Sequence, residues 1–498
     1  MNMPNNVRQN CLLVLAGAIF PLGLAPFGLW PITVISIAIL FHKLINQSNG
    51  KAFLNSFFYG FGLFFSGASW IYVSIHEFGF LAAPLAFTAT IIFCLLFGAI
   101  FALPFVLFGY LPKTQLALVL GCPSLWVLSE WLRSWVLTGF PWLYAGYSHT
   151  DTWLSGWAPL GGVFLLSYFC ALLSVLLTLL CQSLNRFTYP RLLCSLTVAL
   201  FLGGYFLQSI NWTQETDNSL SVALIQPNIP QNEKWSTNMR VSIMQQLAKQ
   251  TEPLWDHDII VWPEAAIPTI PERIPRYMES LKLRAKEHNA TLLAGAITYN
   301  PEKQNYYYNS LLAVNDRAEQ YNKTRLVPFG EYVPFESYIR GLIKFFDLPM
   351  SKITKGSRDQ QPFSIRGQYV SAVICYEVVY PDLVARNTLH SSLIVTVSND
   401  TWFGRSLGPI QHMQMVRMRA IENAKPVVRA TNNGITGFID FKGHLQASLD
   451  RGVKSTFSGT VQPRTGYTPF SMVGSWPIII FSMLSCLSLV ILRSKLEP

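Results

Sequence analysis

Long apolar segments alternate with short polar connections along the first 210 residues, and one more apolar segment lies close to the C-terminus. A helix needs roughly 20 apolar residues to cross ~30 Å of hydrocarbon. Seven segments before Asn211 and one after the polar middle section approach that length. The pattern therefore predicts a bundle of eight transmembrane helices, at approximately Leu12–Leu24, Trp30–Leu44, Phe53–Ile75, Leu81–Leu111, Leu116–Trp131, Pro159–Leu180, Leu192–Leu207 and Pro477–Leu492.

The apolar runs become short and rich in β-branched residues between Asn211 and Val473, where they alternate with helix-like segments. Alternating strands and helices are typical of a layered α/β domain whose sheets are buried. We expect helices at Thr237–Glu252, Glu272–Asn289, Pro381–Ser391 and Ile410–Ala424, and strands at SVALIQPNI, DIIVWPEAAI, TLLAGAITY, YNSLLAVND, QYVSAVICYE, SLIVTVSND and PVVRATNNGITGFID. The chain then divides into a seven-helix transmembrane region (1–210), an α/β domain (211–473) and a C-terminal transmembrane helix with its tail (474–498).

The composition agrees with a membrane protein. Hydrophobic residues make up 51% of the chain and charged residues only 13%, which is too apolar for an ordinary soluble protein. The middle section holds most of the ionisable residues, with a mild positive excess that suits either nearby anionic lipid head groups or a plain solvated surface. The sequence contains no basic run and no helix with Lys and Arg on one face, which argues against nucleic acid as a partner.

Lys and Arg in the short loops predict how the chain is oriented in the membrane, because these residues favour the cytoplasmic side. With eight spans, one side of the membrane receives Arg8, Lys43, Lys51, Lys113, Arg186, Arg191, Arg493 and Lys495. The short loops on the opposite side contain only Arg133. Both termini are therefore expected in the cytoplasm. Seven crossings before Asn211 then place the α/β domain on the opposite face, which in a bacterium is the periplasm.

One cysteine stands apart from the other seven. Cys375 belongs to the polar middle section, whereas the remaining cysteines fall in or beside the apolar segments. An oxidising compartment favours paired cysteines, so an unpaired one is either buried and inert or retained for its chemistry. The isolated thiol alone does not decide between these two interpretations.

Polar groups at other strand ends give the thiol a chemical context. Glu264 follows the run DIIVW, Lys323 and Glu331 lie in YNKTRLVPFGEY, and Cys375 ends the run QYVSAVI. Each residue also has an ordinary explanation, as a helix-start carboxylate, a surface cation or a small apolar filler. Together a base, a cation and a nucleophile form a complete set for acyl transfer, because a thiol needs a proton acceptor and the resulting oxyanion needs positive charge.

The motifs around these residues resemble those of a known superfamily. They are WPE at Glu264, NKTRLVPFGEYVP at Lys323, ICYE at Cys375, and NDTWFG followed by QMVRMRAIENAKPVVRATNNG. They are similar to the nitrilase, or carbon-nitrogen hydrolase, superfamily with its Glu-Lys-Cys triad. With seven apolar segments before and one after, the whole chain resembles the bacterial apolipoprotein N-acyltransferase family. The resemblance implies an αββα sandwich for the middle section and an inner-membrane location.

The resemblance also implies roles for individual residues. Glu264 would be the general base, Lys323 the cation facing the tetrahedral intermediate and Cys375 the acyl-carrying nucleophile. Glu331 would orient the lysine, and Tyr376 and Glu377 flank the thiol in the family's order. Residues expected to gate the site or bind substrate are Trp235, Trp402, Tyr338, Phe345 and Phe346, the last three within the amphipathic segment YIRGLIKFFDLPM.

The implied reaction takes an acyl chain from a membrane phospholipid and places it on the N-terminal amine of a diacylglyceryl-modified apolipoprotein. No metal or diffusible cofactor is expected, because the eight histidines lack ligand spacing and no CxxC occurs. One alternative is a membrane-tethered amidase or nitrile hydrolase, in which water resolves the acyl-cysteine. A second is a transporter with a solute-binding outer domain, and this alternative predicts ionisable groups within the spans, which are scarce.

Overall fold

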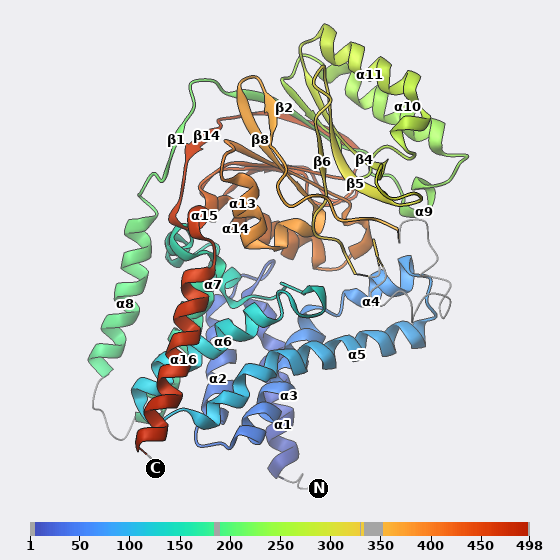
Figure 1. Cartoon of the computed structure of the whole chain (residues 1–498). Helices are drawn as coiled ribbons and strands as arrows, with labels where there is room; N and C mark the ends of the chain where they lie inside the picture. The colour runs from blue at the N-terminus through green and yellow to red at the C-terminus, as the bar shows by residue number, and fades with distance from the viewer. Residues whose placement is uncertain (1–4, 184–189, 329, 333–351, 497–498) are drawn as a thin grey trace.

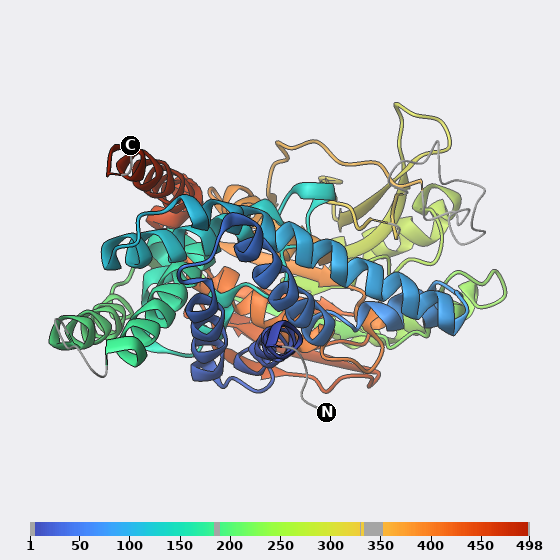
Figure 2. The ribbon, with the colours of Figure 1, turned by 90° about the horizontal axis from the view of Figure 1, so that it is seen from below.

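The computed structural model describes residues 5–183, 190–328, 330–332 and 352–496. A helical region forms one end of the molecule and an α/β domain forms the other (Figure 1). Helix α1 (Asn5–Ile19) begins, and helix α16 (Trp476–Leu496) ends, at the end of the helical region remote from the α/β domain (Figure 1). Seen from that end, α16 and α8 (Pro190–Leu207) lie at one side of the helical region (Figure 2).

The predicted apolar segments form helices. Besides α1, α8 and α16, they are α2 (Trp30–Leu44), α3 (Asn49–Gly67), α5 (Ala83–Ala102), α6 (Gln115–Leu132) and α7 (Ala158–Ser183). Within the described residues, four stretches are long and apolar enough to cross a membrane, namely Ala83–Tyr110, Gln115–Leu132, Trp153–Cys181 and Trp476–Ser494. Helix α3 and the segment Ile71–Phe78 add a fifth if the bent pair counts as one span, while α2 and Cys194–Leu207 are apolar but shorter. The chain is therefore a multi-pass membrane protein.

One predicted helix, Phe53–Ile75, is broken. Helix α3 ends at Gly67, and the chain turns by 60° into α4 (Ile71–Val73) and the π-helical turn η2 (Ser74–Phe78). Gly67 packs directly against Leu143, since a Cβ at Gly67 would lie 2.6 Å from a methyl group of that side chain. After the turn, the Ser74 hydroxyl donates to the Trp402 carbonyl at 2.7 Å. The break therefore brings the helical region into contact with a loop of the α/β domain.

Two six-stranded sheets form the described part of the α/β domain. Along the first sheet the order is β13 (Ser455–Val461), β2 (Leu220–Gln226), β3 (Ile259–Val261), β4 (Thr291–Tyr299), β5 (Tyr307–Val314) and β6 (Gln320–Asn322). Along the second it is β12 (Leu445–Ser448), β11 (Gly437–Ile439), β10 (Val427–Thr431), β9 (Leu393–Ser398), β8 (Gln368–Ile374) and β7 (Phe363–Ile365). Strands β2, β3 and β4 are parallel, as are β8, β9 and β10. A small pair, β1 (Thr213–Glu215) with β14 (Arg464–Gly466), lies beside them.

Apolar side chains hold four layers together. Inward-facing residues of both sheets, such as Val222, Leu293, Val395 and Val428, form one buried cluster between them. Helices α10 (Arg240–Thr251) and α11 (Pro275–Glu287) cover the outer face of the first sheet, whereas α13 (Pro381–Thr388) and α14 (Gly408–Asn423) lie between the second sheet and the helical region (Figure 1). The prediction of a layered α/β domain is thus confirmed, as a sandwich of two sheets between two layers of helices.

Helix α14 joins the α/β domain to the helical region through buried polar contacts. The Trp142 indole donates to Gln411 at 2.7 Å, and the Gln414 amide donates to the Tyr147 carbonyl at 2.9 Å. Further along the helix, the Glu422 carboxylate accepts from the Val163 backbone at 2.8 Å. Since an unpaired buried polar group is costly, these contacts fix the helix against the helical region. The strand ends next to α14 therefore have a defined position relative to the membrane-spanning helices.

Candidate active site

The three residues expected to form a triad follow the carboxyl ends of strands in both sheets. Glu264 lies in the loop after β3, Lys323 directly follows β6, and Cys375 directly follows β8. Carboxyl ends of parallel strands meet at one edge of a sheet, where loops position polar side chains. Gly295 on β4 allows the Glu264 loop to lie close, since a Cβ there would be 2.2 Å from the Pro263 carbonyl oxygen. The fold therefore brings residues from distant parts of the sequence to a common rim.

Two carboxylates share the buried ammonium of Lys323. Its Nζ donates to Glu264 Oε1 at 3.2 Å and to Glu331 Oε1 at 3.0 Å, and the lysine side chain is only 1% exposed. Asn309 Nδ2 bridges the same two oxygens at 2.8 and 2.7 Å. The remaining oxygens are also occupied, because Asn399 N donates to Glu264 Oε2 and Val327 N donates to Glu331 Oε2, both at 2.8 Å. All four carboxylate oxygens of Glu264 and Glu331 therefore accept hydrogen bonds.

The electrostatics keep this cluster ionised. Burial would raise the pKa of the Glu264 carboxyl, yet the charge of Lys323 and the hydrogen bond from Asn309 outweigh burial and lower it. Burial would likewise lower the pKa of the Lys323 ammonium, but the charges of Glu264 and Glu331 outweigh that effect and raise it. At neutral pH the structure thus holds an anionic proton acceptor next to a cation.

The Cys375 thiol lies in the field of both groups and is held on a strained turn. Its backbone has φ of +51°, a conformation that costs a non-glycine residue about 1–3 kcal/mol and persists mainly where function requires it. Burial raises the pKa of the thiol to about 12, the Glu264 carboxylate adds to the increase, and Lys323 opposes it. Only about one thiol in 10⁵ is then ionised at pH 7. A nucleophile at this position needs a base that removes its proton as it attacks, and the ionised Glu264 carboxylate is close enough to act electrostatically on the thiol.

A buried hydrogen-bond network of His412, Arg429 and Asp400 holds the turn at Cys375. Burial and the charge of Arg429 lower the pKa of His412, so its ring is neutral. His412 Nε2 donates to the Cys375 carbonyl at 3.3 Å, and its Nδ1 lies 3.1 Å from Arg429 Nη2 and 3.3 Å from Asp400 Oδ1. Arg429 also pairs with Asp400 at 2.9 Å, and Ser398 donates to that carboxylate at 2.6 Å. The network fixes the carbonyl of the strained residue and hence the direction of its side chain.

Glu377 connects the lysine loop to the cysteine turn. This fully buried carboxylate accepts from the backbone N–H of Thr324 at 2.6 Å and of Ile374 at 2.8 Å. The Tyr321 hydroxyl donates to both of its oxygens at 3.0 Å. Glu377 therefore lies behind Cys375 and sets the position of the Lys323 loop. Its neighbour Tyr376 points to the helical region, where its hydroxyl donates to the Gly139 carbonyl at 3.0 Å.

The residues expected to gate the site lie in different surroundings. Trp235, after α9 (Gln231–Lys234), packs against a small cluster that includes Ala265, the residue next to Glu264. The Trp402 ring lies 5.7 Å from the ring of Phe78 on η2. Tyr338, Phe345 and Phe346 lie outside the described residues.

Several residues at the site were not identified from the sequence. Asn309, Asn399 and Lys234 surround Glu264, with Lys234 Nζ donating to the Glu264 carbonyl at 3.1 Å. Asn399 carries a usable signal, because it follows the apolar run SLIVTVS just as Cys375 follows its own strand. Ser398 and Asp400 flank Asn399 at the same strand end, whereas His412 and Arg429 have no such signal, since their pairing depends on the packing of α14 against β10.

Comparison with known proteins relates both parts of the chain to described families. The profile described as the apolipoprotein N-acyltransferase N-terminal domain matches residues 16–176, and the profile described as carbon-nitrogen hydrolase matches residues 221–469. An apolipoprotein N-acyltransferase of Azotobacter vinelandii is 40% identical over 499 residues, which cover 98% of this chain and 96% of that one. Proteins of the same name from Pseudomonas aeruginosa and Vibrio vulnificus are 40% and 38% identical, over 94% and 97% of this chain and 92% and 96% of theirs.

Solved structures resemble the chain over about half its length. The C. elegans NitFhit protein is 20% identical, with a TM-score of 0.39 over 49% of this chain and 61% of its own. Saccharomyces cerevisiae Nit3, a member of branch 10 of the nitrilase superfamily, is 16% identical, with a TM-score of 0.37 over 51% of this chain and 93% of its own.

Proposed function

The chain belongs to the apolipoprotein N-acyltransferase family and catalyses apolipoprotein N-acylation, and from this premise we propose that the acyl chain passes through a thioester on Cys375. The donor is a membrane phospholipid. The acceptor is the free α-amine of the diacylglyceryl-modified cysteine at the N-terminus of an apolipoprotein. The observation that carries the proposal is the buried contact of Glu264 with Lys323 beside a thiol that is protonated at rest.

In the first half-reaction, Glu264 takes the thiol proton while the Cys375 sulfur attacks the ester carbonyl of the phospholipid. Negative charge then develops on the carbonyl oxygen. The Lys323 ammonium stabilises that charge, and fixed charges of this kind supply about 2.7–4 kcal/mol in comparable sites. The intermediate collapses to a thioester, and the leaving lysophospholipid oxygen receives the proton from Glu264.

In the second half-reaction, the α-amine of the apolipoprotein attacks the thioester carbonyl. Glu264 removes a proton from the amine, Lys323 again faces the oxyanion, and the Cys375 sulfur leaves and recovers its proton. The products are an amide and the free enzyme. Because both substrates are anchored in one leaflet, a thiol held at bilayer height meets them without the loss of freedom that a soluble encounter requires.

Supporting residues keep this geometry. Glu331 orients Lys323 through its 3.0 Å contact, and Glu377 sets the position of the lysine loop relative to the thiol. Tyr376 anchors the same turn to the helical region through Gly139. Trp235 and Trp402, together with Tyr338, Phe345 and Phe346, admit and retain the acyl chains.

We propose eight crossings and a periplasmic α/β domain. The five spans would be joined by the shorter apolar helices α2 and Cys194–Leu207, and by α1, whose second half is apolar. The start of α1 and the end of α16 lie on the side remote from the α/β domain, which fits cytoplasmic termini (Figure 1). The corresponding domains are residues 1–210, 211–473 and 474–498, in the bacterial inner membrane.

A chase experiment tests the proposal. The purified protein is incubated with a phospholipid labelled in its acyl chain, and a hydroxylamine-sensitive adduct is sought on Cys375. A peptide bearing an N-terminal diacylglyceryl-cysteine is then added, and the label should move to its amine. Cys375→Ala should form no adduct. An adduct that passes only to water would favour the hydrolase instead, and the absence of any adduct would overturn the thioester.

A further inference from the structure

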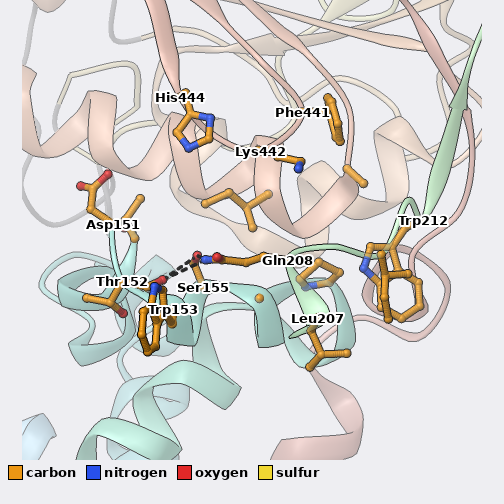
Figure 3. Close-up of a pocket in the computed structure, with 16 residues that line it drawn as sticks. Asp151, Thr152, Trp153, Ser155, Leu207, Gln208, Trp212, Phe441, Lys442 and His444 are labelled. Atoms are coloured by element: carbon orange, nitrogen blue, oxygen red, sulfur yellow. Dashed lines mark hydrogen bonds between the residues drawn. The ribbon is translucent and has the colours of Figure 1, made fainter. Parts of the chain in front are cut away.

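A pocket lies away from the thiol, where α8 meets the α/β domain. It has a volume of about 310 Å³, within the range of small-molecule sites. Figure 3 shows that Lys442 and His444 of the α/β domain line one wall, whereas Asp151, Thr152 and Trp153 of the helical region line the opposite wall. Gln208, just after α8, closes the floor by donating to the Thr152 carbonyl at 3.2 Å and to the Ser155 hydroxyl at 2.9 Å.

The exposed face of α8 leads directly to this pocket. Large apolar side chains at helical spacing lie along it, and they are Val198 (55% exposed), Leu202 (43%), Tyr205 (48%) and Phe206 (66%). Leu207 and Ile210, which follow on the chain, line the pocket itself. In both views of the ribbon α8 stands at the side of the helical region (Figures 1 and 2). Such a face is suited to hydrocarbon chains of lipid, and it ends at the polar pocket.

Beside the pocket, α8 packs closely against the segment that contains Trp153 and Trp157. A Cβ at Gly204 would lie 2.2 Å from the Trp153 carbonyl oxygen, and the Trp157 indole donates to the Leu200 carbonyl at 2.9 Å. The Trp153 ring contacts the Tyr205 ring at 5.2 Å. Tryptophan and tyrosine collect at the boundary between hydrocarbon and water. The pocket therefore lies at head-group depth.

The charges at the pocket favour a phosphate. The Lys442 side chain is exposed, and among the described residues no carboxylate pairs with its ammonium. The acidic residue on the opposite wall, Asp151, is already neutralised, because Arg417 Nη1 donates to it at 3.1 Å. His444 is held by Asp440, 3.0 Å from its Nδ1. Lys442, whose Nζ lies 5.7 Å from the centroid of the Phe441 ring, thus has no carboxylate partner in the part of the chain that the structure describes.

From these observations we infer that the pocket binds the phosphate head group of a glycerophospholipid whose acyl chains lie along α8. Lys442 contacts the phosphate, and the pocket wall around Gln208 and Trp153 receives the glycerol and ester region. The site is distinct from the thiol. The pocket is lined by Ile421 and Ala424 at the end of α14, whereas His412, which contacts Cys375, lies near its start.

Native mass spectrometry of the full chain tests this inference. Delipidated protein carrying Cys375→Ala, which prevents acyl transfer from consuming the probe, is titrated with dimyristoylphosphatidylglycerol. Lys442→Glu should weaken binding of the tightest lipid by about tenfold, since the charge is reversed at the membrane surface. Lys442→Arg should keep the affinity. Lys454→Glu, an exposed lysine of the same domain, is the matched control and should change nothing.

Two further arms identify the source of the phosphate and the place of binding. Dimyristoylglycerol, which has the same chains without phosphate, should bind with no dependence on Lys442. Hydrogen exchange of residues 207–212 should slow when the phospholipid binds and should not slow in Lys442→Glu. Equal lipid affinity in Lys442→Glu and the parent would overturn the inference. Displacement of the lipid by millimolar inorganic phosphate would assign the pocket to free phosphate and overturn the lipid assignment. Neither result depends on thioester chemistry at Cys375.

Discussion

Replacing Glu264 by glutamine removes the proposed base and leaves the shape of the side chain almost unchanged. The native carboxylate accepts hydrogen bonds from Lys323, Asn309 and the Asn399 backbone. A glutamine amide has only one acceptor atom, so at least one of these donors faces an NH₂ group. One unsatisfied buried donor costs about 1–3 kcal/mol of folding stability. Lys323 keeps Glu331 as its partner, so the variant is expected to fold.

The effect on catalysis should be larger than the effect on stability. The thiol is protonated at neutral pH, because burial raises its pKa to about 12, and glutamine cannot accept its proton. Loss of a general base typically slows a reaction by about 10²–10⁴-fold, or about 2.7–5.5 kcal/mol. Glu264→Asp retains the carboxylate but withdraws it by one methylene. Its acylation rate should lie between those of the parent and of Glu264→Gln.

Single-turnover acylation of Cys375 by a labelled phospholipid measures this effect, with intact-protein mass spectrometry as the readout. Glu272→Gln, which changes an exposed carboxylate of the same domain, is the matched control and should acylate at the parent rate. Thermal unfolding of each variant separates folding from chemistry. An acylation rate for Glu264→Gln within threefold of the parent would refute the role of this residue as base.

Three further predictions follow from the same geometry. Glu331→Gln should lower kcat/KM by about 10–100-fold, because Lys323 loses one of its two anionic partners, and steady-state acyl transfer checks this. The rate of iodoacetamide reaction with Cys375 should rise about tenfold per pH unit between pH 7 and 9, since only the thiolate reacts and the pKa lies above this range; a plateau below pH 8 would contradict it. His412→Phe removes the donor to the Cys375 carbonyl and should slow acylation by about tenfold at unchanged KM. His412→Asn retains a donor and should recover part of the rate. Equal rates in the two variants would argue against a role for the hydrogen bond.

The helices and the buried strands followed from local pattern. Helices α6, α7 and α16 begin and end within a few residues of the predicted segments, because each lies in a long, mainly apolar stretch. Strands β4 and β9 likewise come from continuous runs without charged residues, and β9 is rich in β-branched residues. Strand β3 is shorter than predicted, since Pro263 carries no N–H and cannot continue the ladder.

The edge strands β12 and β13 were not predicted from the sequence pattern. All four residues of β12 are exposed, and β13 alternates between partly buried and exposed positions, so neither has an apolar face that a sequence reveals. Their pairing comes from partners elsewhere in the chain. The break after α3 was missed for a similar reason, because the segment that follows it contacts Trp402, a residue distant in the sequence.

The sequence identified those site residues that follow predicted strands or lie in family motifs. Glu264, Lys323 and Glu331 were selected as polar residues after strands, and the structure brings these three together in one hydrogen-bonded cluster. The roles assigned to them remain predictions. The network of Asp400, His412 and Arg429 was missed, because a buried charge is recognised only when its partner on another element is known.

The proposed reaction requires that Cys375 carries the acyl chain between two substrates. Rapid mixing of the protein with a labelled phospholipid and the diacylglyceryl-cysteine peptide, followed by quenching and peptide mass mapping, tests it most directly. We expect a thioester on Cys375 that forms before any product and decays at the rate of amide formation. Amide that accumulates without this adduct, or an adduct that decays more slowly than product appears, would contradict the account.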